Sequence, residues 1–377
     1  MDTNVIALLE KIKKQAILCQ YVYIFGAGFR AKVLTGILLS EIKDVSFYSA
    51  VITNKKRTSV DFCWDIPVVE LQEIETPNED TFFIIGTVEA YVKEICMELE
   101  ASGYTNYIHI AEEEFQRLKS RYVSKRYEEI FQADVLKGKA DETVKVISPI
   151  TKIYMVKSEM DKEVIDPKKC SGMISIQGGS ALSGRKIAEL RDDTGINISE
   201  RNRQWNEFTV IYWLWKHAVM DSEYIGLCHY RRIFDADKVE NRIKKETPDV
   251  ILAEPEVLFP SIEAHYCSLH YEEDFSLMKK ILRLRYPEYY TFAERYFSQE
   301  LFIPYNMIIA RNTVFAEYAE WIFPLLEEIE LQWRPHGDAY EDRAVAFLGE
   351  WLTGVYFLYH RNRLKISYSK IRLLETR

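Results

Sequence analysis

Four side chains that can do chemistry stand next to one another at residues 229–232, where the sequence reads His-Tyr-Arg-Arg. They follow the short apolar run 224–228, which contains a glycine and is typical of a buried strand. Ligands of open α/β sheets bind beyond the carboxyl ends of strands. The planar guanidinium groups of Arg231 and Arg232 suit phosphate because each can donate two parallel hydrogen bonds. The run therefore predicts an anion site at the end of a buried strand.

Two adjacent carboxylates, Asp192 and Asp193, open a polar loop at residues 192–199. The loop is rich in residues whose side chains favour turns by bonding to their own backbone. The paired carboxylates also supply hard oxygen ligands, which suit a divalent cation or the hydroxyl groups of a sugar. A plain surface loop explains the same composition. Both interpretations stay open from the residues alone.

A second pair of carboxylates, Asp235 and Asp237, follows the His-Tyr-Arg-Arg run after a few residues. Carboxylates in an Asp-x-Asp triplet can hold a divalent metal ion. The pattern is short and common by chance, so we treat it as a secondary metal candidate. His265 and His270 do not lie on one face of a helix at their spacing, which disfavours a metal site there.

A helix rich in aromatic residues precedes the strand that carries the run. Its apolar side chains recur at spacings of three and four, which places them on one face. We expect this face to pack into the core and to fix the strand. Asn202, Asn206 and Glu207 stand near the helix start, where anions and polar ligands are favoured. The apolar stripe consists of Trp205, Phe208, Tyr212, Trp215 and Val219.

The N-terminal third alternates apolar strands with helical patterns, which predicts a parallel, doubly wound α/β sheet. Its first strand, residues 21–28, runs into a turn of the form GxGxxA at Gly26, Gly28 and Ala31. Such a turn offers backbone N–H groups to a nucleotide phosphate. Tight packing of the strand against the helix explains the same glycines. A weak nucleotide site and a purely structural turn both stay open.

The residues after the second predicted strand disfavour NAD(P) as a cofactor. NAD recognition usually requires an acidic residue roughly 20 residues beyond the glycine turn. The chain reads Ile-Thr-Asn-Lys-Lys at residues 52–56, without a carboxylate.

The length and composition predict two globular domains. The chain has 377 residues, of which 47% are hydrophobic and 28% charged. This is long for one core and too apolar for a disordered chain. A polar, mostly helical stretch separates the first strand–helix pattern from a second one. We therefore expect a Rossmann-like domain at 1–115, a helical linker at 116–147 and a second α/β domain at 148–377.

Charge and apolar pattern limit the place of action and the partners. The net charge of −9 argues against a broad nucleic-acid surface. We expect a cytoplasmic protein, because no segment resembles a signal-peptide core and no run approaches about 18 apolar residues. The basic tail either faces solvent or contacts an anionic membrane surface peripherally. Its cations are Arg361, Arg363, Lys365, Lys370 and Arg372.

The chain from about residue 150 to 360 resembles a family long labelled as a domain of unknown function. That family occurs in bacterial capsule and exopolysaccharide gene clusters and is treated as glycosyltransferases. The His-Tyr-Arg-Arg run is the most distinctive feature of the resemblance. The other features are residues 192–199, 207–216, 265–270, 305–307 and 343–350.

The resemblance implies a GT-A-like α/β domain with a mixed sheet and a nucleotide-sugar donor bound at the strand ends. In that fold the run at 229–232 takes the place of the metal-binding Asp-x-Asp motif. Its arginines then neutralise the leaving diphosphate, in place of Mn²⁺ or Mg²⁺ or beside it. The expected donor-binding residues are Asp192, Asp193, Asn197, Tyr230, Arg231, Arg232, Asn306 and Arg343.

An inverting transferase needs a carboxylate that takes the proton of the acceptor hydroxyl. The candidates are Glu350 and Asp342, with His229 as a further catalytic residue. Glu350 fits equally well as an ion-pair partner of Arg343. The family-level expectation is transfer of hexose or galactofuranose from a UDP donor to a lipid-linked saccharide.

Two other classes of function stay open. The glycine turn fits an NAD(P)-dependent oxidoreductase of sugar nucleotides, although that reading leaves the C-terminal domain unexplained. A non-catalytic nucleotide or sugar sensor, with the N-terminal part docking onto partner enzymes, accounts for binding features without a reaction.

Overall fold

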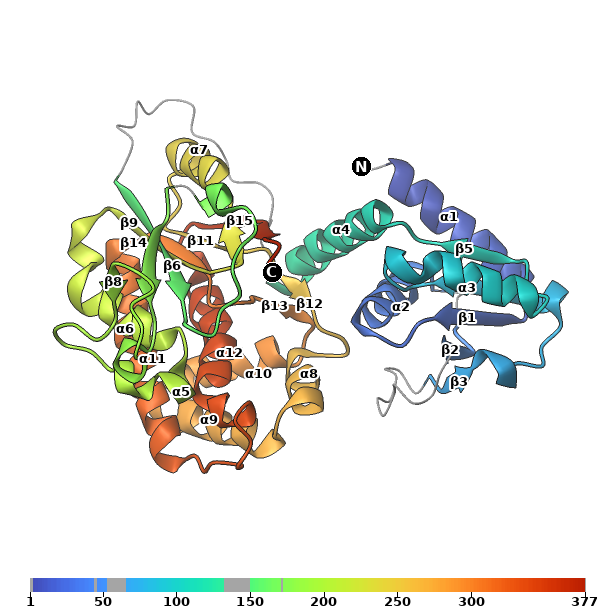
Figure 1. The fold of residues 1–377 in the computed structure, drawn as a ribbon. Helices are drawn as coiled ribbons and strands as arrows, with labels where there is room; N and C mark the ends of the chain where they lie inside the picture. The colour runs from blue at the N-terminus through green and yellow to red at the C-terminus, as the bar shows by residue number, and fades with distance from the viewer. Residues whose placement is uncertain (1–2, 44–45, 53–65, 132–149, 171, 377) are drawn as a thin grey trace. The chain divides into compact units, whose positions relative to one another are not determined.

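The protein is described by a computed structural model that covers residues 3–43, 46–52, 66–131, 150–170 and 172–376 (Figure 1). Residues 53–56, where an NAD site would have an acidic residue after the second strand, lie outside these ranges. So does the second half of the expected linker, residues 132–147.

The chain forms two compact units, each with its own sheet. The N-terminal unit comprises Met1–Ala133 together with Val257–Ser261. The C-terminal unit comprises Asp134–Glu256 and Ile262–Arg377.

The N-terminal unit contains a five-stranded sheet with the order β3-β2-β1-β4-β5, in which all neighbouring strands run parallel. The chain starts at the central strand β1 and winds outward in both directions, which is the doubly wound order. The predicted α/β fold of this part is therefore confirmed. The strands are β1 (Tyr21–Phe25), β2 (Ser49–Ile52), β3 (Val68–Glu70), β4 (Thr81–Ile85) and β5 (Tyr107–His109).

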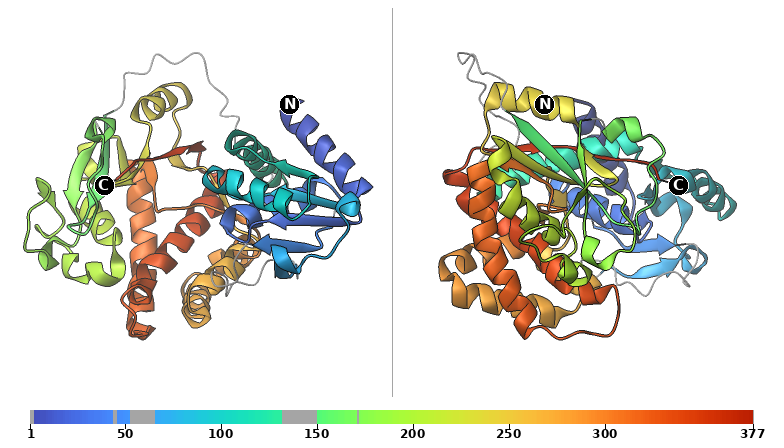
Figure 2. Two further views of the ribbon diagram at one scale, coloured as in Figure 1. Left: turned by 45° about the vertical axis from the view of Figure 1, so that its right-hand side comes forward. Right: turned by 60° about the vertical axis from the view of Figure 1, so that its left-hand side comes forward.

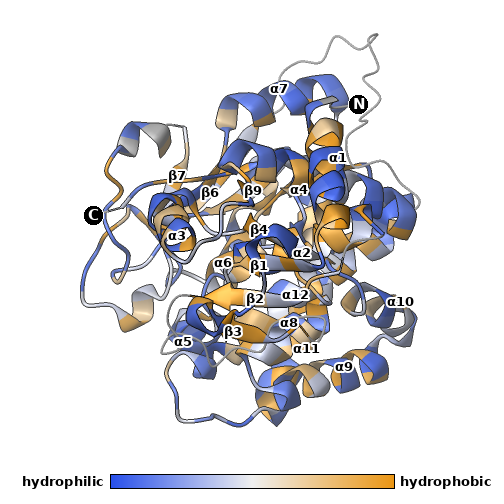
Figure 3. Cartoon of the chain, turned by 90° about the vertical axis from the view of Figure 1, so that its right-hand side faces the viewer, coloured by the Kyte–Doolittle hydropathy of each residue, from blue (hydrophilic) through white to orange (hydrophobic). Residues whose placement is uncertain are grey.

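Helices cover this sheet because parallel strands need both faces buried. Figure 3 shows β2 and β3 in the orange of hydrophobic residues, whereas the helices alternate between orange and blue. The helix α4 (Glu112–Phe131) buries Phe115, Leu118 and Tyr122 among others. The described part of the expected linker thus belongs to the N-terminal unit. The other helices are α1 (Thr3–Leu18), α2 (Phe29–Glu41) and α3 (Glu89–Ala101).

The C-terminal unit contains a seven-stranded mixed sheet with the order β15-β11-β14-β9-β6-β7-β8. Its β14 runs antiparallel to both neighbours, and the other neighbouring strands run parallel. The mixed sheet expected for this domain is confirmed. The strands are β6 (Thr151–Lys157), β7 (Ile174–Gln177), β8 (Leu190–Arg191), β9 (Tyr224–His229), β11 (Val250–Ala253), β14 (Ile308–Arg311) and β15 (Ile366–Ser369).

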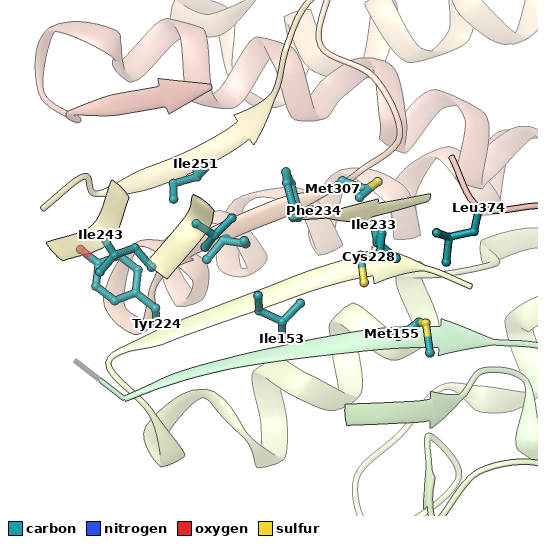
Figure 4. Packing of buried hydrophobic residues seen from close by; sticks show 12 residues of the cluster. Ile153, Met155, Tyr224, Cys228, Ile233, Phe234, Ile243, Ile251, Met307 and Leu374 are labelled. Carbon is teal, nitrogen blue, oxygen red and sulfur yellow. The ribbon is translucent and has the colours of Figure 1, made fainter. Parts of the chain in front are cut away.

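One face of this sheet packs against α7 (Ala236–Glu246), as Figure 4 shows. Successive side chains of a strand point to opposite faces, so Tyr224 and Cys228 of β9 enter this layer together. Ile243 of α7 and Ile251 of β11 belong to the same cluster. This layer packs against one face of β9 from Tyr224 to Cys228.

The other face packs against a helical layer that contains α6 (Phe208–His217) and the neighbouring pair α11 (Asn312–Gln332) and α12 (Ala344–Tyr359) (Figure 2). The Phe323 ring of α11 stacks on the rings of Trp205 and Trp215, with centroids 6.1 and 5.6 Å away. Trp205 and Phe208 are therefore core, as predicted, whereas Tyr212, Trp215 and Val219 are only partly buried. The remaining helices are α5 (Asn202–Trp205), α8 (Ile262–Leu269), α9 (Glu272–Arg285) and α10 (Pro287–Phe297).

The expected aromatic helix is interrupted between α5 and α6. Asn206 has a φ of 43° and a ψ of −125°, which no helical residue adopts. The break turns the chain before α6 begins and leaves Asn206 and Glu207 facing away from the aromatic stripe, into the cavity described below.

Two cations of the basic tail are paired within the C-terminal unit. Arg363 contacts Glu317 at 2.7 Å, and Arg372 contacts Asp235 at 2.6 Å. These pairs lower the attraction of the tail to an anionic membrane surface. Among the described residues, no helix is both long and apolar enough to cross a membrane.

Candidate active site

A cavity of about 650 Å³ opens at the edge of the C-terminal sheet where β6 and β9 end. Because β14 runs antiparallel to β9, the turn that precedes β14 reaches the same edge. The cavity lining includes His229, Tyr230, Arg231 and Arg232, so the residues of the run predicted as a site do gather there.

The lining combines cations with carboxylates, all from the described part of the C-terminal unit. This mixture suits a ligand that has both an anionic group and hydroxyl groups, since each can find a partner of suitable charge. The cations are Lys157, Arg231, Arg232 and Arg343, and the carboxylates are Asp161, Glu207 and Glu350.

Backbone pairing fixes the two arginines of the run. Strand β10 (Arg232–Phe234) pairs antiparallel with β16 (Ile371–Leu373). The carbonyl oxygen of Arg231 accepts from the backbone N–H of Leu374 at 2.7 Å. The guanidinium carbon of Arg232 lies 4.7 Å from the centre of the Tyr305 ring, a cation–π distance. Arg232 is thus carried by β10, and Arg231 lies in the bend before it, held by its backbone hydrogen bond to Leu374.

A strained turn holds two titratable groups of the cavity. Tyr305 and Asn306 have φ values of 75° and 50°, a conformation that non-glycine residues rarely adopt. The Tyr305 backbone N–H donates to Oε1 of Glu350 at 2.6 Å. Its carbonyl oxygen accepts from Nε2 of His229, also at 2.6 Å. Strain of this kind persists where surrounding contacts impose it, often at functional sites.

The side chain of Asn306 is buried and supports a third group. Its amide donates to Oε1 of Glu207 at 2.8 Å, and its oxygen accepts from the Thr353 hydroxyl at 2.7 Å. Asn306 is buried and does not line the cavity, and its side chain positions Glu207, which does.

Glu350 is the carboxylate with the most perturbed acidity in the cavity. Burial raises its pKa to about 7, and the nearby Glu207 carboxylate adds to the rise. The hydrogen bond from Tyr305 and the charges of Arg232 and Arg343 oppose it. A carboxyl group that titrates near neutral pH can both accept and return a proton.

Arg343 is fixed from two sides. With its amide oxygen toward Arg343, Asn206 accepts from Nε and Nη2 at 2.9 and 3.0 Å. The guanidinium carbon lies 5.4 Å from the Tyr340 ring centre and 5.3 Å from the Phe347 ring centre. The strained Asn206 therefore helps to aim a cation at the cavity.

Asp192 has a structural role that the sequence did not reveal. Its carboxylate is fully buried and accepts hydrogen bonds from the Ser180 and Gly179 backbone N–H groups at 2.9 Å. It also accepts from the hydroxyl groups of Ser199 and Thr209 at 2.6 Å. The carboxylate thus ties its loop to α6, and Asp192 does not line the cavity, so its expected contact with the donor stays a prediction.

The rest of that loop is also engaged locally. Asp193 pairs with Arg191, with Oδ2 2.6 Å from Nη2. Asn197 donates to the Gly195 carbonyl and accepts from the Ser199 backbone N–H. Neither residue lines the cavity, although both were expected to contact the donor.

The metal candidates lie apart from this cavity. Asp235 and Asp237 line a different cavity of about 730 Å³. Asp235 caps α7 by accepting from the Lys238 backbone N–H and pairs with Arg372. No three His, Cys, Asp or Glu side chains in the described ranges gather to hold a metal ion. The use of Mn²⁺ or Mg²⁺ with a bound donor diphosphate stays a prediction.

Asp342, the alternative catalytic carboxylate, holds a loop. Its Oδ1 accepts from the His336 backbone N–H at 2.8 Å, and it does not line the cavity. Glu350 is the candidate base that the structure places in the cavity.

Sequence reasoning missed two charged residues, Lys157 and Asp161. Lys157 ends β6, so its place at a strand end was the available signal. Asp161 accepts from the Ser158 backbone N–H at 2.7 Å. Burial raises the pKa of Asp161, whereas His229 and Lys157 lower it. Its position in a polar loop gave no comparable signal.

The glycine turn of the N-terminal unit shows how the chain packs there. Gly26 has a φ of 119°, and its N–H donates to the Val51 carbonyl. Ala31 would lie 3.3 Å from a side-chain carbon added to Gly26. Gly28 has open space around it. Packing explains Gly26 and Ala31, and the space at Gly28 leaves a weak nucleotide site as an expectation.

The chain was compared with known proteins by sequence and by structure. No curated protein matches the sequence. The structure resembles one titled WbbM bifunctional glycosyltransferase, with a TM-score of 0.54 and 23% identity. The match covers 60% of this chain and 46% of that chain, and at this identity it shows a shared fold. The family described as domain of unknown function DUF4422 matches residues 152–362, more than half of the chain. The chain therefore belongs to the DUF4422 family.

Proposed function

We propose that the chain is a glycosyltransferase that uses a nucleotide-sugar donor and acts in the cavity at the ends of β6 and β9. The observation that carries the proposal is that Arg231 and Arg232 line the same cavity as Glu350, a carboxyl whose pKa is about 7. The fold shared with a protein titled a glycosyltransferase supports the same class of reaction.

In the proposed reaction the arginines bind the diphosphate of the donor. Arg231 and Arg232 supply guanidinium groups, and Lys157 adds a third positive charge. Preorganised cations stabilise charge that develops on a leaving group, and they need no reorganisation during the reaction. In this proposal the arginines neutralise the diphosphate, in place of Mn²⁺ or Mg²⁺ or beside it.

Glu350 is the proposed general base. The acceptor hydroxyl oxygen forms a bond to the anomeric carbon of the sugar, and the bond from that carbon to the diphosphate oxygen breaks. The hydroxyl proton passes to Glu350, and the electron pair leaves with the diphosphate toward the arginines. Nε2 of His229 donates to the Tyr305 carbonyl, which can only accept, and this hydrogen bond fixes the orientation of the ring at the cavity.

The resemblance to capsule and exopolysaccharide enzymes supports a finer proposal for the substrates. The donor is UDP-hexose or UDP-galactofuranose, and the acceptor is a lipid-linked saccharide. The protein then works in the cytoplasm, with peripheral access to the membrane that holds its acceptor.

A ligand panel tests the proposal against the other classes of function. Thermal unfolding is followed with UDP, UDP-sugars, NAD(H) and NADP(H), each with and without Mn²⁺, and donor hydrolysis is measured in parallel. Stabilisation by UDP together with slow release of the donor sugar supports a transferase. A response to NAD(P)H alone supports an oxidoreductase. Binding of UDP-sugars without hydrolysis or transfer supports a sensor.

A further inference from the structure

We propose that the rings of Tyr340 and Phe347 form an aromatic platform beside the cavity that binds a sugar ring of the acceptor. This inference rests on the proposed function, since it assigns a second substrate to the same site. Phe347 lines the cavity, and the Tyr340 ring centre lies 5.3 Å from its ring centre. Tyr340 is 56% exposed. The aromatic surface therefore continues from the cavity to the solvent.

Hydrogen bonds and ring packing hold the platform in place. Oδ1 of Asp338 accepts from the backbone N–H groups of Tyr340 and Glu341 at 2.8 and 3.0 Å. The His270 ring packs 4.4 Å from the Phe347 ring centre, and its Nδ1 lies 3.1 Å from Oε2 of Glu341. A binding surface whose side chains are already ordered loses little entropy when it binds a ligand.

The chemistry of the platform fits a saccharide. The face of an aromatic ring carries partial negative charge, and the C–H bonds on one face of a sugar ring carry partial positive charge. Arg343 lies 5.4 Å from the Tyr340 ring and 5.3 Å from the Phe347 ring, where its N–H groups can bond to sugar hydroxyls. Stacking plus directed hydrogen bonds is what a polar ring with apolar C–H faces requires.

The position favours the acceptor over the donor. The donor diphosphate is assigned to Arg231 and Arg232 within the cavity, whereas Tyr340 lies outside the lining. A saccharide on a lipid carrier has to approach from solvent, and the exposed ring of Tyr340 is the part of the platform that solvent reaches. Stacking of the uracil base of the donor is the competing use of the same rings.

Saturation-transfer NMR with methyl glycosides of galactopyranose, galactofuranose, glucose and mannose tests the platform. The variants are Tyr340→Ala, Tyr340→Phe and, as a matched exposed tyrosine elsewhere, Tyr91→Ala (52% exposed). We expect ring C–H signals from at least one glycoside with wild type, Tyr340→Phe and Tyr91→Ala, and about a tenfold weaker affinity with Tyr340→Ala. Stabilisation by UDP should be equal in all four proteins.

The other outcomes overturn the platform or the function separately. Glycoside signals that persist in Tyr340→Ala, or that are absent with wild type, overturn the platform. Loss of UDP stabilisation in Tyr340→Ala with unchanged glycoside signals assigns the rings to the nucleobase and also overturns it. If UDP stabilises none of the proteins while glycoside binding depends on Tyr340, the proposed function fails and the sugar platform stands.

Discussion

The backbone N–H of Tyr305 donates to Oε1 of Glu350 at 2.6 Å from a residue whose φ is 75°. A left-handed backbone thus holds a cavity carboxyl whose pKa is raised to about 7. The same peptide accepts from His229 through its carbonyl oxygen. The strained turn is therefore the part that brings β14, β9 and α12 together at the site.

Glu350→Gln should remove the proposed base while keeping the size of the side chain and an oxygen for the Tyr305 N–H. We expect turnover to fall by about 10²- to 10⁴-fold, the usual contribution of general-base catalysis. In wild type, kcat/KM should rise with pH through about 7, because the base acts only when deprotonated. Transfer assays between pH 5 and 9 measure this. A wild-type profile flat across pH 7, or an active Glu350→Gln, would contradict the role.

Glu350→Gln should also be more stable than wild type at high pH. The folded-state pKa of Glu350 is about 7, above the ordinary value of 4.5, so burial penalises its charged form. Wild type therefore loses stability as the pH rises from about 4.5 through 7, relative to Glu350→Gln. The difference should reach on the order of 3 kcal/mol above pH 8 and vanish near pH 4. Urea unfolding at both pH values measures it.

Asn306→Ala should destabilise the protein by about 2–4 kcal/mol. It leaves Glu207 and Thr353 without their buried partner, and alanine is unfavourable at a φ of 50°. Asn306→Gly loses the same hydrogen bonds but tolerates the backbone, so it should be about 1 kcal/mol more stable than Asn306→Ala. Urea denaturation compares the two. Equal stabilities would mean that the left-handed backbone costs nothing here.

Asp192→Asn should separate a structural role from a ligand role. The amide group would face N–H and O–H donors that now point at a buried carboxylate, so we expect a loss of about 2–4 kcal/mol in unfolding free energy. The folded variant should bind UDP as wild type does in isothermal titration calorimetry. Unchanged stability with lost UDP binding would restore Asp192 as a donor ligand.

The double variant Asp235→Asn/Asp237→Asn should leave donor binding unchanged. Asparagine at position 235 keeps the cap of α7, and the substitutions remove the charges of the expected metal motif together with the ion pair between Asp235 and Arg372. We expect the same UDP-induced rise in Tm as in wild type, with EDTA or with Mn²⁺. If Mn²⁺ strengthens UDP binding in wild type but not in the variant, these carboxylates do hold the metal.

Much of the fold was readable from the sequence because its signals are local. An apolar run predicts the strand Tyr224–His229, and the N-terminal alternation of strands and helices predicts the parallel sheet. The clustering of residues 229–232 followed from the rule that ligands meet strand ends. The aromatic stripe was also readable, but the break at Asn206 was not, because asparagine inside a helical pattern does not reveal a positive φ.

The positions of individual site residues depended on contacts between distant segments. Asp192 and Asp193 are alike in sequence, yet only the fold shows that Asp192 is fully buried under four donors. Glu350 and Tyr305 are 45 residues apart and meet through one backbone hydrogen bond. In the Asp235-Ala-Asp237 triplet, Asp235 caps the helix that begins at Ala236. An aspartate just before a helical pattern is a capping signal, and the metal hypothesis did not take it into account.

The central claim is that Arg231 and Arg232 bind the diphosphate of a nucleotide-sugar, and calorimetric titration with UDP tests it most directly. Arg231→Ala/Arg232→Ala is compared with Arg285→Ala, which removes an arginine outside the cavity. We predict that the double variant stays folded and binds UDP roughly 100-fold more weakly, because two charge-assisted contacts are lost. Arg285→Ala should bind as wild type does. Wild-type affinity for UDP in the folded double variant would contradict the claim.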